Sequence, residues 1–148
     1  MYKITVDFDD FNGDHREQTL YFSLNKPEII KLLKERPTLQ DELSKMADRL
    51  AKQEADTTLY VDFITMVDDF IRLSYGIKTE SGNFRKNADI LDDFTSSAAY
   101  DALFTKLLNN PKEFDTLMEG IFPADIMTEE LQKQIKEEQS KYFGKQNN

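Results

Sequence analysis

The chain of 148 residues contains no cysteine, no tryptophan and a single histidine, His15. Without cysteine it forms no disulfide and no thiolate metal site, and one imidazole cannot build a multi-histidine metal centre. No apolar run approaches the roughly 18 residues that a membrane-spanning helix needs. The first residues also lack the apolar core of a signal peptide. We therefore expect neither a structural metal nor a membrane anchor.

Basic residues are outnumbered by acidic ones, 19 Lys plus Arg against 28 Asp plus Glu, which gives a formal net charge of −9. Phosphate backbones are bound by clustered Lys and Arg, so this balance disfavours nucleic acid as a partner. Basic or apolar protein surfaces fit better. An acidic mimic of nucleic acid is an alternative, but it requires carboxylates gathered on one face, and they are scattered along the chain.

Motifs that carry catalysis or ligand binding are absent from the sequence. The five glycines, at positions 13, 76, 82, 120 and 144, match neither dinucleotide-binding nor Walker spacing. No nucleophile elbow surrounds a serine. A calcium loop fails in register, because aligning Gly13 with the required glycine puts Phe8 at the first ligand position and Thr19 where a bidentate Glu belongs. The sequence predicts no enzyme, no cofactor and no metal.

Alternating side chains predict a β-hairpin within residues 2–24. Apolar residues alternate with polar ones from Tyr2 to Phe8 and again from Gln18 to Leu24, and the turn dipeptide Asn12-Gly13 lies between the two runs. A hairpin alone is marginally stable in water. We expect its apolar face to pack on the helices that follow.

Capping and breaking residues divide the rest of the chain into helices. Asn25, Thr38, Asn87 and either Ser96 or Ser97 are expected caps, and Gly76 is expected to end a helix in the left-handed conformation. Residues 77–84 form either a second small hairpin or an ordered loop. The expected helices are a short acidic one from Ala88 to Phe94 and five with apolar stripes: Ile29, Ile30, Leu32 and Leu33; Leu39, Leu43, Met46 and Leu50; Leu59, Phe63, Val67, Phe70, Ile71 and Ser74; Ala99, Tyr100, Leu103, Phe104, Leu107 and Leu108; Phe114, Leu117, Met118 and Ile121.

These patterns predict an α+β fold that is mostly α, with an N-terminal β-hairpin followed by a bundle of about six or seven helices. We expect one globular domain at 1–125, with the hairpin at 2–24 and the helical part at 25–125. Residues 126–148 are expected to form a charged C-terminal helix and a disordered tail. The amphipathic helix from Leu39 to Leu50 needs a neighbour to cover it, which suggests a homo-oligomer.

Aromatic residues are more abundant than a small core requires. Eleven Phe, six Tyr and five Met occur in the chain, and such residues are enriched where proteins meet proteins. Most of them lie at helical spacing and are expected in the core. Phe84, Phe122 and Phe143 lie in turns or at helix ends, where we expect exposure.

Short aromatic motifs in the middle of the chain resemble those of tail assembly chaperones of long-tailed phages. The motifs are Tyr75-Gly76-Ile77-Lys78, Ser81-Gly82-Asn83-Phe84-Arg85-Lys86, Phe94-Thr95-Ser96-Ser97-Ala98-Ala99-Tyr100-Asp101-Ala102-Leu103 and Gly120-Ile121-Phe122-Pro123. The opening is also similar, in Asp10-Phe11-Asn12-Gly13, Arg16-Glu17 and Tyr21-Phe22-Ser23-Leu24-Asn25-Lys26. The resemblance covers residues 2–123.

The resemblance implies a non-enzymatic role. Such chaperones coat the tape measure protein, keep it soluble and let tail tube subunits polymerise around it, in the cytoplasm of the bacterial host and without remaining in the mature virion. The tail tube protein is a second possible partner. A virion structural or head-tail joining protein is the alternative. The candidate partner-binding residues are Tyr75, Phe84, Phe94, Tyr100, Phe122 and Pro123, and the sequence leaves open whether they contact the client or hold the fold.

Overall fold

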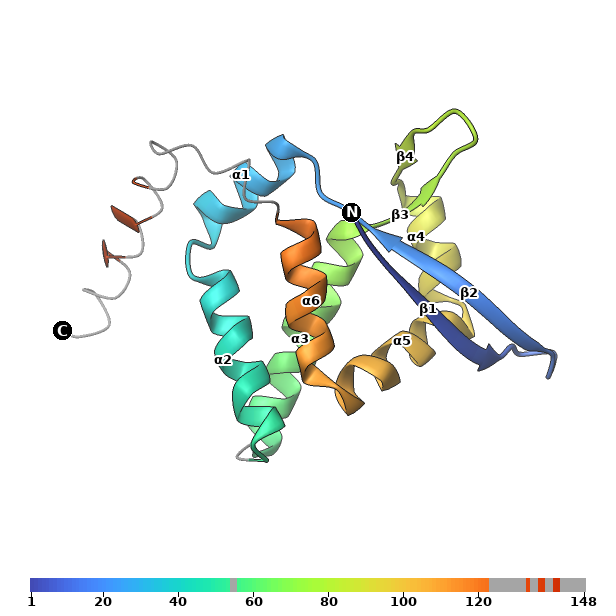
Figure 1. Ribbon diagram of the computed structural model, residues 1–148, viewed down its shortest axis with the longest axis horizontal. Coiled ribbons are helices and arrows are strands. Elements are labelled where there is room, and N and C mark those ends of the chain that lie inside the picture. The colour runs from blue at the N-terminus through green and yellow to red at the C-terminus, as the bar shows by residue number, and fades with distance from the viewer. Residues whose placement is uncertain (54–55, 123–132, 134–135, 138–139, 142–148) are drawn as a thin grey trace.

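The computed structural model describes residues 1–53, 56–122, 133, 136–137 and 140–141 (Figure 1). Six helices and four strands are bounded within this part of the chain, so the α+β prediction, mostly α, is confirmed. Their order is β1 (Tyr2–Asp9), β2 (His15–Phe22), α1 (Lys26–Glu35), α2 (Leu39–Ala51), α3 (Thr57–Ser74), β3 (Tyr75–Lys78), β4 (Phe84–Arg85), α4 (Ala88–Thr95), α5 (Ala98–Asn109) and α6 (Pro111–Ile121). Pro123 and most of the predicted C-terminal helix and tail at 126–148 lie outside the described residues.

The N-terminal hairpin is confirmed. β1 and β2 pair antiparallel from Tyr2 opposite Phe22 to Asp9 opposite His15. In the turn, the Asp10 carboxylate accepts hydrogen bonds from the backbone of Asn12 and Asp14, at 2.9 Å each. Gly13 takes a φ of +85°, which a side chain would disfavour. The inner face buries Tyr2, Ile4, Val6, Leu20 and Phe22.

The sheet continues past the first hairpin. β3 pairs with the end of β2, Gly76 opposite Tyr21 and Tyr75 opposite Phe22, and β4 pairs with β3. The four strands therefore lie in the order β1-β2-β3-β4. Of the two alternatives for residues 77–84, the structure shows the small hairpin.

Gly76 has a different role from the predicted one. α3 ends at Ser74, Tyr75 is extended, and the chain passes directly into β3 without a left-handed residue at this point. A Cβ on Gly76 would lie 2.6 Å from the Phe84 ring and 2.8 Å from the backbone oxygen of Arg85. Glycine is required here because β4 and Phe84 approach the backbone closely.

Two of the predicted helix caps hold and two do not form as side-chain caps. Asn25 caps α1 in a capping box with Glu28, and Asn87 accepts from the backbone of Ile90 at the start of α4. Thr38 and Ser97 stand before α2 and α5, but neither side chain caps its helix. The Ser97 hydroxyl instead donates to the carbonyl of Phe94, at 2.6 Å.

The helices α2, α3 and α6 pack together, and the hairpin lies on the other side of the molecule against α5 and α6 (Figure 1). The rings of Phe63 and Phe70 on α3 meet Phe114 on α6 edge-on, with centroids 5.8 and 6.0 Å apart. α2 buries Leu39 and Leu43 against these helices. Helices of the same chain therefore cover the apolar stripe of α2. A second copy of the chain is not needed to bury it.

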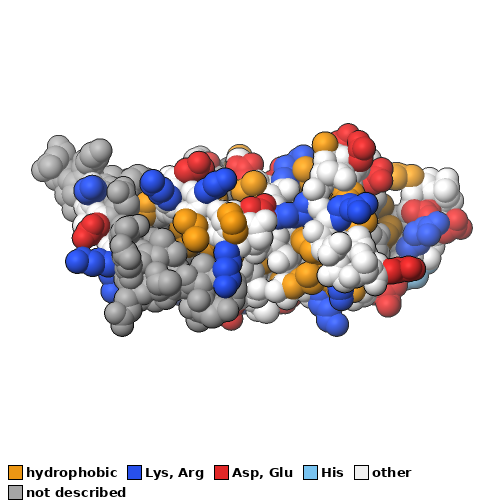
Figure 2. All heavy atoms as spheres, turned by 90° about the horizontal axis from the view of Figure 1, so that it is seen from above, with side chains coloured by type: hydrophobic (Ala, Val, Ile, Leu, Met, Phe, Trp, Pro, Cys, Tyr) orange, Lys and Arg blue, Asp and Glu red, His pale blue; other side chains and the backbone are white. Residues whose placement is uncertain are grey.

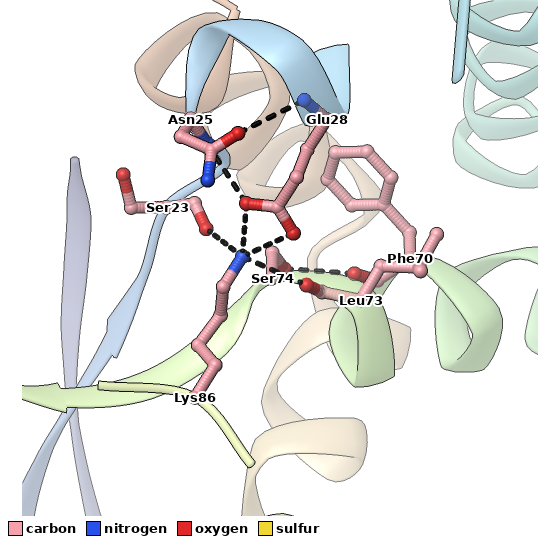
Figure 3. A network of polar contacts seen from close by, with 7 residues as sticks. All are labelled: Ser23, Asn25, Glu28, Phe70, Leu73, Ser74 and Lys86. Atoms are coloured by element: carbon pink, nitrogen blue, oxygen red, sulfur yellow. Dashed lines mark hydrogen bonds and ion pairs between the residues drawn. The ribbon is translucent and has the colours of Figure 1, made fainter. Parts of the chain in front are cut away.

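A polar network around Lys86 joins three segments that are distant in sequence (Figure 3). The ammonium of Lys86 donates to both carboxylate oxygens of Glu28, at 2.7 and 2.8 Å, and to the carbonyls of Ser23 and Leu73. The Glu28 carboxylate also accepts from the backbone N–H of Asn25. We call these residues, together with Ser74, the Lys86 junction. It ties the start of α1 and the end of α3 to the segment that leads into α4.

Candidate protein-binding surface

Three of the six candidate residues lie in one aromatic cluster. Tyr75 and Phe94 stack with centroids 4.0 Å apart at 16°, and Tyr100 meets Phe94 edge-on at 5.4 Å. Tyr75 and Phe94 are buried, whereas Tyr100 is half-buried at the edge of the cluster. Burial raises the pKa of the Tyr75 hydroxyl, and the Asp93 carboxylate adds to that rise. In this arrangement Tyr75 and Phe94 stabilise the core, and Tyr100 connects the core to the surface.

Tyr100 is held by polar contacts with α3. Its hydroxyl donates to the Asp68 carboxylate, and Arg72 donates to the hydroxyl at 3.4 Å. The guanidinium of Arg72 also lies 5.7 Å from the centre of the ring. Burial and the hydrogen bond to Asp68 raise the pKa of Tyr100. These contacts fix the orientation of the ring between α3 and α5.

A groove of about 310 Å³ opens between α3 and α5. Its apolar lining is Ile64, Tyr100 and Phe104, and Thr65, Asp68 and Asp101 add polar groups. The rings of Tyr100 and Phe104 meet edge-on, 5.1 Å apart. An apolar floor with a few polar groups around it is typical of grooves that accept an amphipathic helix.

A second groove, of about 350 Å³, lies between α2 and α6 and contains another candidate residue, Phe122. It is lined by Ser44, Asp115, Met118, Glu119 and Phe122. Phe122 stacks on Phe70, with centroids 5.6 Å apart, so half of it is buried. The exposure predicted for Phe122 is therefore only partial.

Phe84 is also half-buried and not exposed as predicted. Its ring lies over the backbone of Gly76, which leaves no room for a side chain there. Phe84 is separate from the Tyr75, Phe94 and Tyr100 cluster. The structure thus brings together three candidates and places Phe84 and Phe122 at two other positions.

Several exposed large apolar side chains lie outside the set of candidate partner-binding residues. Phe11 in the hairpin turn is 85% exposed, Val61 and Leu73 on α3 are 54% and 49% exposed, and Ile30 on α1 is 41% exposed. Ile30 was predicted to belong to the buried stripe of its helix, which is wrong. The signal for Val61 lay in the helix period, because it falls on the side of α3 opposite the stripe that contains Phe63, Val67 and Phe70.

Groups for metal chemistry do not gather in the described part of the chain, where no three His, Cys, Asp or Glu side chains are placed to hold an ion. His15 lies on the hairpin surface, with Nδ1 3.2 Å from a carboxylate oxygen of Asp9. Within the described ranges, no helix combines the length and the apolar character needed to cross a bilayer. Among the described residues, this surface carries the two grooves and several isolated apolar side chains.

Comparison with protein families shows to which family the chain belongs. A family model described as phage tail assembly chaperone matches residues 1–148. The chain belongs to the phage tail assembly chaperones. The resemblance noted in the aromatic motifs is thereby confirmed over the whole sequence. No curated protein and no solved structure matches the chain.

Membership of the phage tail assembly chaperones implies protein partners in tail assembly. Both grooves of this chaperone combine apolar walls with carboxylates, which suits partners that carry apolar and basic side chains. Tyr100 and Phe122 are the candidate residues that line them. The structure leaves these two within reach of a partner, whereas Tyr75 and Phe94 lie below the surface.

Proposed function

We propose that this phage tail assembly chaperone binds the tape measure protein and keeps it soluble while the tail tube assembles around it. The observation that carries the proposal is the family match over residues 1–148. The chaperone acts without catalysis, in the cytoplasm of the bacterial host, and leaves before the virion matures. The tail tube protein is a second partner in the same process.

The groove between α3 and α5 supports this role. A long helical client exposes apolar stripes that aggregate until they are covered. Ile64, Tyr100 and Phe104 offer an apolar floor to such a stripe, with Val61 exposed on the adjoining turn of α3. The net charge of −9 keeps the complex soluble by repulsion between neighbouring chaperones.

The candidate residues divide into two roles under this proposal. Four of them contact a protein partner, either the tape measure protein or the tail tube protein: Tyr100, Phe84, Phe122 and Pro123. Tyr75 and Phe94 act through Tyr100, because their stacked rings support it from below. A substitution of Tyr75 or Phe94 is therefore expected to reduce binding and stability together.

Co-expression with the tape measure protein tests the proposal. The tagged chaperone should retain the tape measure protein in the soluble fraction after affinity purification. The Val61→Asp variant should lose most of the retained client, because it places a charge beside the apolar floor of the groove. The matched control is Leu73→Asp, which adds the same charge at a similarly exposed position on α3 outside that groove.

Two results would count against the proposal. If the wild-type chaperone retained no client and the client remained insoluble, binding of the tape measure protein would be wrong. Mass spectrometry of mature virions checks the other half of the role. Stoichiometric amounts of this chain in the particle would favour the virion structural or head-tail joining alternative.

A further inference from the structure

Three polar side chains line the α3–α5 groove, and they differ in how they are bonded. Asp68 is fully engaged, because one carboxylate oxygen accepts from the Tyr100 hydroxyl and the other accepts from Nε of Arg72, at 3.0 Å. The Thr65 hydroxyl donates to a backbone carbonyl one turn earlier on α3, at 2.9 Å. Among the described residues, the carboxylate of Asp101 forms neither a hydrogen bond nor an ion pair.

Asp101 stands at the rim of the groove. It is exposed, whereas Tyr100 and Phe104, which line the groove from the same helix, are half-buried. Asp101 lies in the first turn of α5, where the positive end of the helix dipole stabilises a carboxylate. That stabilisation leaves the carboxylate oxygens available to accept from a donor on a partner.

The apolar floor of the groove has the length of about one helical turn. Tyr100 and Phe104 are four residues apart on α5, which is about 6 Å along the helix axis. Their rings meet edge-on, and Ile64 lines the groove from α3. Two apolar side chains at positions i and i+4 of a partner helix match this length.

We infer that the α3–α5 groove selects client helices in which a Lys or Arg side chain lies beside two apolar side chains one turn apart, and that Asp101 makes this selection. The apolar pair packs on the floor, and the cation pairs with the Asp101 carboxylate at the rim. The inference rests on the proposed function, since it uses the groove proposed for the client. It adds which helices of the client are bound.

The bonding of Asp68 explains why Asp101 is the selecting residue. A cation that paired with Asp68 would have to displace Arg72 or the Tyr100 hydroxyl, and it would gain little over the bonds that it broke. A cation that pairs with Asp101 displaces only water. A client helix with Glu at that place would instead bring two carboxylates together, which lowers its affinity.

A general attraction between an acidic protein and any basic helix is the alternative explanation. The net charge of −9 attracts cations to the molecule as a whole. On the face shown in Figure 2, however, Asp and Glu side chains lie among Lys and Arg side chains and do not gather into one acidic patch. Asp89 provides a matched control, because it is also exposed, lies in the first turn of α4 and does not line the groove.

Binding of two synthetic peptides to the full chain tests the inference. Each peptide has about 18 residues, a length that supports a helix, and both carry the same leucines at i, i+4 spacing. The residues that flank the leucines are Lys in one peptide and Glu in the other. In fluorescence anisotropy at low salt, the wild type should bind the Lys peptide about tenfold or more tightly than the Glu peptide. Added salt should reduce this preference, because an ion pair at the rim is screened.

Three variants locate the preference. Asp101→Lys should lose the preference for the Lys peptide and bind the Glu peptide more tightly than the wild type does. Asp101→Asn removes the charge with little change of shape and should bring the two affinities close together. Asp89→Lys changes the net charge as much as Asp101→Lys does and should keep the wild-type preference. Both positions are exposed, so circular dichroism should show unchanged folding.

Three outcomes would overturn the inference. One is equal affinity of the wild type for the two peptides, and another is a wild type that binds neither peptide. The third is a preference that survives in Asp101→Lys or is lost equally in Asp89→Lys, which would assign it to net charge. The proposed function is judged separately, by retention of the tape measure protein and its loss in Val61→Asp. A wild type that retained this client without selecting the Lys peptide would refute the inference alone.

Discussion

The Lys86 junction and the α2–α6 groove both place a lysine beside carboxylates, with opposite results. At the junction, Lys86 is bonded to two oxygens of Glu28 and to two backbone carbonyls, and its side chain is 22% exposed. Beside the groove, Lys112 is 58% exposed, pairs with Asp48 and lies 3.9 Å from Asp115, which lines the groove. Among the described residues, the other oxygen of Asp115 has no hydrogen-bond partner.

The difference separates two uses of charge in one small protein. Polar groups that connect segments of the fold are satisfied, because an unpaired buried group at a junction lowers stability. The carboxylates in the groove are not fully paired within the described part of the chain, and they are therefore available to bind a protein partner. Four substitutions test this difference between the junction and the groove, and their expected effects on stability decrease in the order Gly76→Ala, Lys86→Met, Asn25→Ala and Asp115→Asn.

Gly76→Ala should be the most destabilising change, because a methyl group beside the junction meets the Phe84 ring at 2.6 Å and the Arg85 backbone at 2.8 Å. Overpacking of this kind lowers the free energy of unfolding by about 2 kcal/mol. Urea unfolding measures this loss of free energy. The control is Gly82→Ala, where there is open space and only the φ of +87° opposes a side chain, at a cost of about 1 kcal/mol. A loss at Gly76 no larger than at Gly82 would contradict the close approach of β4.

Lys86→Met should lower the free energy of unfolding by about 2 kcal/mol, since it leaves the Glu28 carboxylate and two carbonyls without their donor. Lys112→Met is the matched change at the groove. It removes an exposed pair with Asp48 and should destabilise the protein less. If both variants lost the same free energy of unfolding, hydrogen bonding of the polar groups would not distinguish the junction from the groove.

Asn25→Ala should reduce the free energy of unfolding by about 1 kcal/mol, because it removes the side-chain oxygen that caps α1 and one half of the capping box. Asn25→Asp keeps an acceptor at the same position and serves as the control. Urea titration of both variants separates loss of the cap from loss of the amide. An Asp variant as unstable as the Ala variant would show that the cap is not the cause.

Asp115→Asn should have the smallest effect, a gain within about 1 kcal/mol at neutral pH. The pKa of Asp115 is raised in the folded state, mainly by burial, so the folded chain holds its proton more tightly than the unfolded chain. Stability then falls as pH rises from the unfolded pKa through the folded pKa. The advantage of the Asn variant should therefore be present at neutral pH and disappear on acidification. If the stability gain of Asp115→Asn increased at acidic pH, the pKa of Asp115 would not be raised in the folded state.

Much of the fold could be predicted from the sequence, because local patterns determine it. The hairpin follows from side-chain alternation and from Asn12-Gly13, and the buried stripe of α3 follows from its helical period. The sequence-based predictions were wrong where a tertiary contact determines the role of a residue. Gly76 is read locally as a helix stop, whereas the approach of Phe84 from a later segment is what requires glycine.

The candidate surface was less predictable, because exposure depends on which helices meet. Tyr100 and Phe122 were selected by motif, and the grooves that they line are formed by side chains far apart in sequence. The Lys86 junction was not predicted either, since nothing local indicates that Lys86 reaches Glu28, 58 residues earlier. The sequence pattern places Ile30 in the apolar stripe of its helix, although Ile30 lies between Lys26 and Lys34, one turn away on each side. That spacing was the available signal for an exposed face.

Suppression of aggregation is the direct measure of the proposed role, in which this chaperone covers apolar surface on the tape measure protein. A tape measure fragment diluted from denaturant should scatter light alone and remain clear with an equimolar amount of the chaperone. Leu73→Asp should protect as well as the wild type, and Val61→Asp should protect poorly. Scattering that is unchanged by the wild-type chaperone at equimolar amounts would contradict the account.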